Sequence, residues 1–231
     1  WPDYDAESAR FTVRLEGADA AGELLVWYGN PSATTTSDSD SVFIARDLTK
    51  FSEVDPYNNL SINSDKEIQI SGLSSNYDAY IYKEISERTT GRIDFTVYRT
   101  GGARKVNGVG VANSLDDCYA VSPGAFVVYP YSDYFIPWIN GHGTSLNAIT
   151  ASEDNVSKYV TLIYTGTNAI FSVYSDAART TLLGTKSAAW SSPWKYIYAV
   201  SSFNDGTMAS ISGYIRDFVV RAYSDTPPAA T

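Results

Sequence analysis

The chain has 231 residues, 44% of them hydrophobic and 14% aromatic, so it can bury a sizeable core and is not intrinsically disordered. Its formal net charge of −9 repels phosphate groups, which argues against nucleic acid as a partner and against insertion into anionic membranes. No apolar run approaches the ~18 residues that a membrane-spanning helix needs. The length fits one or two domains, and all-β sandwiches of this size often form a single domain.

The N-terminal segment, residues 1–48, alternates apolar and polar residues but is too short for a core of its own. Phe11, Val13 and Leu15 share one face of a predicted strand at its start. A small, polar stretch at 31–41 has almost nothing to bury, so we expect a boundary there or shortly after it. About 40 residues cannot form an independent core. We therefore expect residues 1–48 to be a β segment that packs on the domain behind it.

Short alternating runs separated by turn residues dominate the remainder of the chain. Alternation with period two indicates strands with one buried face, as where Ile93, Phe95 and Val97 alternate with polar residues. Four residues including a glycine join 159–164 to 169–174 and predict a hairpin. Further strands are predicted at 24–28, 67–71, 77–82, 107–112, 124–129, 134–139, 195–202 and 209–222.

About a dozen strands without clean helical periodicity predict an all-β sandwich or barrel. The last strand changes phase near 215–218, which indicates a bulge or a switch in the buried face. We expect residues 49–223 to form one sandwich of two antiparallel sheets, with Phe95, Val97, Leu162, Ile170 and Val173 in its core. Residues 224–231 contain two prolines and are expected to be an extended linker or tail.

Two segments resemble known families. Residues 25–33 read Leu-Val-Trp-Tyr-Gly-Asn-Pro-Ser-Ala and are followed by Ser-Val-Phe at 41–43. Over roughly residues 10–48 this resembles the C-terminal piece of an uncharacterised domain of secreted microbial proteins, which ends in a Tyr-Gly-Asn-Pro-x-Ala signature. The chain begins at Trp1 without a leader peptide, so we expect a trimmed or mature form.

The larger part, from about residue 51 to 223, is similar to the concanavalin A-like lectin/glucanase superfamily, including laminin-G-like modules. The similarity rests on an opening strand at 54–62, the hairpin end at 173–182 and a closing strand at 211–218. The resemblance implies a jelly-roll sandwich of two curved antiparallel sheets, with glycans on the concave face or at a loop rim. Because fold does not determine function, this implication is an analogy.

The sequence lacks the residue patterns that are typical of hydrolase active sites. The enzymes of that superfamily pair carboxylates as Glu-x-Asp-x-Glu on one strand, and this chain has no such run. The nearest carboxylates are Glu53 with Asp55, before a proline, and Glu84 with Glu87, expected at a polar turn. No Gly-x-Ser-x-Gly nucleophile elbow occurs either. We therefore predict that the chain is not an enzyme and does not hydrolyse polysaccharides.

Neither the cysteine nor the acidic residues decide whether the protein is intracellular or secreted, or whether it holds a structural metal ion. Cys118 is the single cysteine, so no internal disulfide forms and no zinc motif is present, which fits both an intracellular and a secreted protein. No cofactor is required. A structural calcium remains an open alternative to acids that merely stabilise turns, and its oxygen ligands would come from Asp116, Asp117, Asp133, Asn204, Asp205 or Asp217.

Aromatic residues concentrate between 129 and 140. On a strand, Tyr134 and Trp138 share one face, while Phe135, Pro137 and Ile139 form an apolar face suited to a core. Aromatic rings stack on sugar C–H surfaces while amides bind hydroxyls, but packing in the core or at a sheet edge is the alternative. The only histidine lies between glycines and is either an exposed loop residue or a ligand contact. The candidate ligand-binding residues are Tyr129, Tyr131, Tyr134, Trp138, Asn140, His142, Trp190 and Trp194.

The sequence therefore predicts a non-catalytic carbohydrate-binding, lectin-like module with a glycan or polysaccharide as its partner. The alternative is a structural surface protein, such as a virion, filament or cell-envelope subunit, with a role in adhesion or assembly. Its partners would be further copies or neighbouring domains. Both readings place the protein outside the cell or exposed on a surface.

Overall fold

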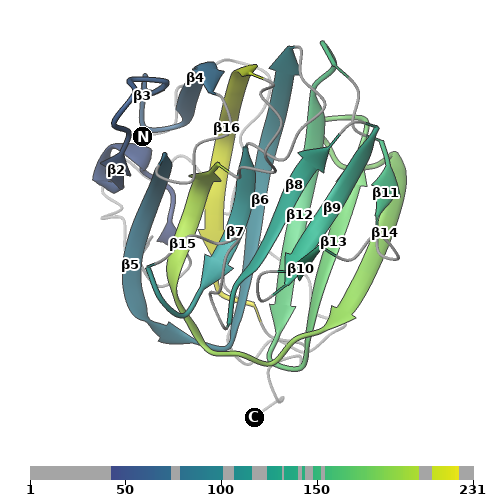
Figure 1. The fold of residues 1–231 in the computed structure, drawn as a ribbon. Coiled ribbons are helices and arrows are strands. Elements are labelled where there is room, and N and C mark those ends of the chain that lie inside the picture. Colours follow the sequence, from purple (N-terminus) through teal and green to yellow (C-terminus); the bar gives the residue numbers. More distant parts are fainter. Residues whose placement is uncertain are drawn as a thin grey trace, which may run out of the picture.

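The protein folds as two antiparallel β-sheets stacked face to face in the computed structural model (Figure 1). The structure describes residues 43–73, 79–100, 107–115, 124–131, 133–139, 142–143, 148–151, 154–202 and 210–223. Within these ranges the single helix is a 3₁₀ turn, Leu48–Lys50, and no helix there is long and apolar enough to cross a membrane. The predicted jelly-roll sandwich is thereby confirmed.

The first sheet, called here the β6 sheet, has the order β14-β13-β12-β6-β16-β4-β3, and β1 also pairs with β16. Its strands are β1 (Phe43–Ala45), β3 (Leu60–Ile62), β4 (Glu67–Leu73), β6 (Thr90–Thr100), β12 (Lys158–Thr165), β13 (Asn168–Tyr174), β14 (Leu182–Ala189) and β16 (Ile211–Arg221).

The second sheet, the β15 sheet, lies in front in Figure 1 and has the order β10-β9-β8-β7-β15-β5-β2, with β11 paired to β9. Its strands are β2 (Ser52–Val54), β5 (Tyr80–Arg88), β7 (Gly108–Ala112), β8 (Phe126–Tyr131), β9 (Tyr134–Ile139), β10 (His142–Gly143), β11 (Ile149–Thr150) and β15 (Trp194–Ser201).

The main core lies between the sheets and follows the alternation of the strands. Phe95, Val97, Leu162 and Val173 are buried there as predicted. Ile170 is a wrong prediction, because the inward set of β13 is Ala169, Phe171 and Val173, and Ile170 has the opposite parity. Ile170 instead pairs with Ile163 on the outer face of the β6 sheet and is only half-buried.

Local sequence signals located most elements. The predicted hairpin is β12–β13, paired from Tyr159 opposite Tyr174 to Tyr164 opposite Ala169. The predicted bulge is confirmed as well, because the register of β16 against β6 shifts between Arg216 and Val219. Strand β14 was not predicted, because its Leu-Leu-Gly-Thr-Lys-Ser-Ala-Ala sequence is largely exposed and lacks alternation.

Several predicted features lie outside the described residues: the strands at 10–15 and 24–28, the boundary at 31–41, the tail from 224, and residues Asp116, Asp117, Cys118, Asn140, Asn204 and Asp205.

Candidate functional site

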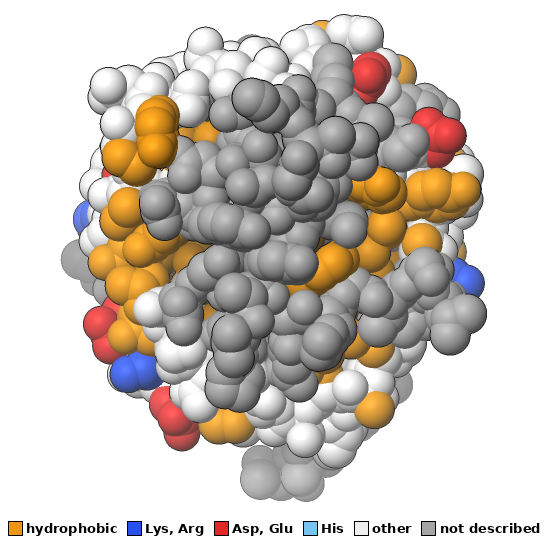
Figure 2. All heavy atoms as spheres, in the orientation of Figure 1, with side chains coloured by type: hydrophobic (Ala, Val, Ile, Leu, Met, Phe, Trp, Pro, Cys, Tyr) orange, Lys and Arg blue, Asp and Glu red, His pale blue; other side chains and the backbone are white. Residues whose placement is uncertain are grey.

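A second hydrophobic cluster lies on the outer face of the β15 sheet, away from the main core. It arises because outward positions on these strands are also apolar: on β8, Phe126 and Val128 point inward, while Val127 and Tyr129 point outward. Hydrophobic side chains occupy much of the described surface on this side (Figure 2). Its seven aromatic members, together with the exposed Tyr134 on the same side of β9, are called here the aromatic face: Tyr80, Tyr82, Tyr129, Tyr131, Tyr134, Trp138, Tyr196 and Tyr198.

Four tyrosines on β5 and β15 form one half of the aromatic face. The rings of Tyr80 and Tyr82 lie 5.7 Å apart, centre to centre. Across the strand pair, Tyr80 is 6.0 Å from Tyr198, and Tyr82 is 6.2 Å from Tyr196, both edge to face. Tyr198 is fully buried, whereas the other three tyrosines are half-buried.

Residues on β8 and β9 form the other half. The rings of Tyr129 and Trp138 meet nearly perpendicular at 6.5 Å, and both residues are buried, with Trp138 only 8% exposed. Tyr131 is half-buried, and Tyr134, directly opposite it in the pairing, is 40% exposed. Tyr131 and Tyr134 are therefore the accessible part of this half.

Strand β7 separates the two halves and carries no large outward side chain. Its outward residues are Gly108, Gly110 and Ala112. A Cβ atom on Gly108 would lie 2.4 Å from the ring of Tyr129, which shows that this ring lies over the glycine. The Tyr129 hydroxyl comes within 3.4 Å of Ser201 Oγ on β15. The glycine therefore lets one tyrosine span from β8 across β7 to β15.

The structure brings four of the predicted site residues together and places two others elsewhere. Tyr129, Tyr131, Tyr134 and Trp138 share the aromatic face. His142 lies in the short strand β10 rather than in a loop, and its backbone pairs with Ile139 of β9. The side chain of His142 and the whole of Asn140 are outside the described part of the structure.

Trp190 and Trp194 belong to the core between the sheets. They are 4% and 0% exposed, and their rings lie 5.2 Å and 5.7 Å from that of Tyr164. In a regular strand Trp194 would share a face with Tyr196, but the register of β15 against β5 shifts between these two residues and reverses the phase. The two tryptophans therefore do not contribute to the aromatic face.

The sequence reasoning missed Tyr80, Tyr82, Tyr196 and Tyr198. The signal was the i, i+2 spacing within each pair, which puts both tyrosines on one side of a strand. Neither pair identifies the other, because β5 and β15 are more than a hundred residues apart in the chain and meet only through sheet pairing.

The carboxylates considered for catalysis are not paired for it. Glu84 lies on β5 rather than beside a turn, is 59% exposed, and forms an ion pair with Lys195 at 3.7 Å. Glu87 lies on the same strand. Burial raises the pKa of Glu53, and the negative charge of nearby Asp55 raises it further. Asp55 itself accepts a hydrogen bond from the Leu60 backbone N–H at 2.7 Å, which stabilises the loop between them. In the described part of the chain no group of three or more potential metal ligands occurs.

Similarity to known families covers only the N-terminal quarter of the chain. Residues 1–58 match the family model of a domain of unknown function (DUF2341), and the resemblance expected at roughly 10–48 falls within this match. No curated protein matches the chain.

Solved structures share the fold at low sequence identity. The VIP36 exoplasmic/lumenal domain in its Ca²⁺/Man3GlcNAc-bound form is 7% identical, with a TM-score of 0.51 over 82% of this chain and 92% of that one. A functionally unknown protein from Saccharomyces cerevisiae is 9% identical, with a TM-score of 0.51 over 77% and 98%. The GH43 protein BlXynB, as a mutant from Bacillus licheniformis, is 8% identical, with a TM-score of 0.50 over 83% and 41%. At these identities the likeness shows a concanavalin-like fold and nothing more.

Proposed function

We propose that the chain is a non-catalytic, lectin-like carbohydrate-binding module of a secreted or surface protein, and that the aromatic face binds its glycan. The observation that carries this proposal is the collection of eight aromatic residues on the outer face of one sheet, of which four are half-buried and one, Tyr134, is exposed. Exposed aromatic surface of this kind stacks on sugar rings, and the tyrosine hydroxyls bind sugar hydroxyls. A relative in fold, VIP36, was solved with Man3GlcNAc bound, which supports a glycan as the ligand class.

The dimensions of the face favour a chain of sugars over a single one. Tyr82 on β5 and Tyr134 on β9 are separated by the strands β15, β7 and β8. Four strand spacings of ~4.8 Å give about 19 Å between the two strands. Such a width matches an oligosaccharide of several rings. Strand β7 is buried throughout, so the contacts open to a ligand lie on the two sides of the face, at Tyr80, Tyr82, Tyr196, Tyr131 and Tyr134.

The proposal is tested by binding of the intact chain to a glycan array, followed by calorimetry with the best ligand. Replacing Tyr82 or Tyr196 by Ala removes a half-buried ring from the face, and each change is expected to weaken binding about threefold to tenfold. The matched control is Tyr174→Ala, which removes a half-buried tyrosine from the other sheet and leaves affinity unchanged. Equal losses in all three variants, or no glycan binding at all, would reject the aromatic face as the site.

A structural surface protein is the second candidate, favoured by the edge of the β6 sheet. Strand β14 ends that sheet, and it carries two exposed leucines, Leu182 at 52% and Leu183 at 42% exposure. An exposed apolar edge strand can pair with another chain. Light scattering after size exclusion distinguishes the candidates, because a monomer supports the module and a large regular assembly supports the structural subunit.

A further inference from the structure

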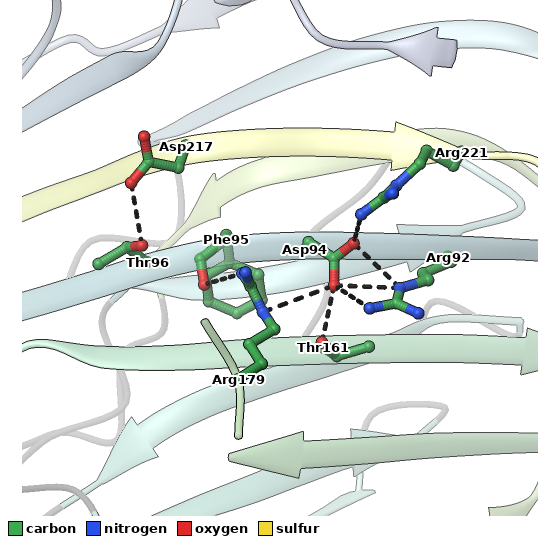
Figure 3. Close-up of polar contacts among 8 residues, drawn as sticks. All are labelled: Arg92, Asp94, Phe95, Thr96, Thr161, Arg179, Asp217 and Arg221. Carbon is green, nitrogen blue, oxygen red and sulfur yellow. Dashed lines mark hydrogen bonds and ion pairs between the residues drawn. The ribbon is translucent and has the colours of Figure 1, made fainter. Parts of the chain in front are cut away.

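A cluster of arginines surrounds one carboxylate on the β6 sheet (Figure 3). It lies on the outer face of that sheet, on the side of the sandwich opposite the aromatic face. Asp94, on the central strand β6, is only 4% exposed in its side chain. Arg92 donates to it from Nε and Nη2 at 3.0–3.1 Å, and Arg221 on β16 donates from Nη2. Arg179, in the turn after β13, places Nε 3.7 Å from the same carboxylate.

The cluster holds more positive charge than its carboxylate balances. Three guanidinium groups and one carboxylate leave a local charge of +2, in a chain whose net charge is −9. Burial lowers the pKa of Arg179; Asp94 opposes this, and the positive charges of Arg92 and Arg221 lower it further. The neighbouring Arg216 has its own partner, Asp217, at 3.7 Å, and adds no net charge. An additional negative group placed among the three arginines would therefore be attracted.

Unused donors accompany the excess charge. Each guanidinium carries five N–H groups, while Asp94 also accepts Thr161 Oγ1 at 2.7 Å and has little acceptor capacity left. The Nε atoms of Arg179 and Arg221 are buried and have no hydrogen-bond partner among the residues that the structure describes. The side chains are nevertheless 22–35% exposed, so the cluster is reachable from solvent.

The turn that carries Arg179 is held in place before any ligand arrives. The carboxylate of Asp176 accepts the backbone N–H groups of Thr181 at 2.6 Å and Thr180 at 3.2 Å, and these bonds lower the pKa of Asp176 to about 2. Arg179 itself donates its backbone N–H to the Asp176 carbonyl at 3.0 Å and has a left-handed φ of 56°. Arg179 Nη2 also donates to the Phe95 carbonyl at 3.4 Å. The guanidinium is thus positioned at little further cost in conformational entropy.

We propose that Arg92, Arg179 and Arg221 form an oxyanion-binding site above Asp94, suited to a carboxylate or sulfate group. Guanidinium groups match such groups with paired N–H donors. The net charge of −9 repels an extended polyanion, so the ligand is a small one that carries a single anionic group. Two sources share this chemistry, a free inorganic anion and an acidic sugar. Because the site is on the opposite sheet, it does not depend on the proposed glycan site.

The test is a titration of the full chain with sodium sulfate at constant ionic strength, balanced with chloride. Nitrogen-15 spectra of the arginine Nε–H groups are expected to show a saturable shift. In Arg179→Gln the affinity is expected to fall about tenfold, the effect of losing one charge-assisted contact. The matched control, Arg216→Gln, removes an arginine from the same sheet face that does not contact Asp94, and is expected to retain the wild-type affinity.

Competition distinguishes the two sources. Displacement of sulfate by glucuronate but not by glucose identifies an acidic sugar as the ligand class, and displacement by neither identifies a free anion. Absence of a saturable shift in the wild-type chain overturns the proposal, and so does an equal loss in the two variants. If Arg179→Gln does not melt cooperatively, Arg179→Lys replaces it, keeping the charge and removing the paired donors.

Discussion

At the scale of single residues, Asp94 shows how a charge is kept inside a sheet. Burial raises the pKa of Asp94, but hydrogen bonds from Arg92 and Thr161, together with the charges of Arg92 and Arg221, outweigh this, and the net direction is downward. The carboxylate therefore stays ionised in the folded protein. Its three arginine partners come from β6, β16 and the turn after β13, so one side chain joins three parts of the β6 sheet.

Replacing Asp94 by Asn is expected to lower the free energy of unfolding at pH 7 by about 2 kcal/mol, because three neighbouring positive charges lose their counterion. The partly exposed arginines are screened by solvent, which keeps the loss below that of a fully buried pair. Urea denaturation at pH 7 measures the difference.

The same variant has a defined pH dependence. Since the folded-state pKa of Asp94 is lowered, its contribution is complete above the unfolded pKa of ~3.9 and is lost as the pH falls through the lower, folded value. The stability difference between wild type and Asp94→Asn should therefore shrink below about pH 4. The control Glu87→Gln changes an exposed carboxylate of β5 and should show little effect. A difference independent of pH would contradict the assigned role of the charge.

At the scale of elements, the bulge in β16 lets one strand pair with two successive neighbours. Before the bulge β16 pairs with β4, and after it β16 pairs with β1. Asp217 sits at the bulge with a φ of 54°, donates its N–H to the Lys66 carbonyl at 2.9 Å, and accepts Thr96 Oγ1 at 3.2 Å. A left-handed residue with a short polar side chain is what this position requires.

Asp217→Val is expected to lower the free energy of unfolding by about 1–3 kcal/mol, because a β-branched residue is strained at positive φ and cannot accept from Thr96. Asp217→Asn keeps a residue that tolerates this conformation and should cost less than half as much. Chemical denaturation of both variants measures the ratio. Similar losses in the two would show that the backbone conformation is not what Asp217 provides.

These elements also show what sequence reasoning can reach. Period-two alternation located β4 and β6, a glycine-containing connection located the β12–β13 hairpin, and a change of phase located the bulge in β16, because each of these signals depends on neighbouring residues. Strand β14 could not be predicted because an exposed edge strand has no buried face, and therefore no alternation of apolar and polar residues. The burial of Trp194 in the core was not predicted, because the face on which it lies depends on a register shift in β15 that the local sequence does not indicate.

Only part of the candidate site could be predicted from the sequence. The side of β9 that bears Tyr134 and Trp138 follows from alternation, and the structure has it on the outer face as expected. The depth to which Trp138 is buried depends on what surrounds it in space, as does the approach of the β5 tyrosines to those of β15. These are properties of pairing between distant strands.

At the scale of the whole molecule, the sandwich has two outer faces of different chemistry. One carries the aromatic face and the other the arginine cluster, although the chain is acidic overall. The arginine cluster gathers positive charge on one face of a chain that is negatively charged overall, so a nearby anion would be attracted to that face. The polypeptide that joins both sheets at the start of the described region is short: β1 belongs to the β6 sheet, and β2, seven residues later, belongs to the β15 sheet.

The last prediction concerns residues 1–40, which we propose to pack on the sandwich. The family match over 1–58 does not stop at the expected boundary near residue 48, and its last part includes β1 and β2, which are built into the two sheets. The preceding segment is therefore tethered to the sandwich. Its apolar side chains, among them Phe11, Val13, Leu15 and Trp27, cannot form a core alone.

Deleting residues 1–40 is expected to lower the free energy of unfolding by about 2–5 kcal/mol, the loss of a few buried apolar side chains at roughly 1.5–3 kcal/mol each, less the entropy regained by the chain. A shorter deletion of residues 1–9 retains those side chains and serves as the control. Differential scanning calorimetry of the three proteins decides the matter: a melting temperature unchanged by the longer deletion would mean that the segment does not pack on the sandwich.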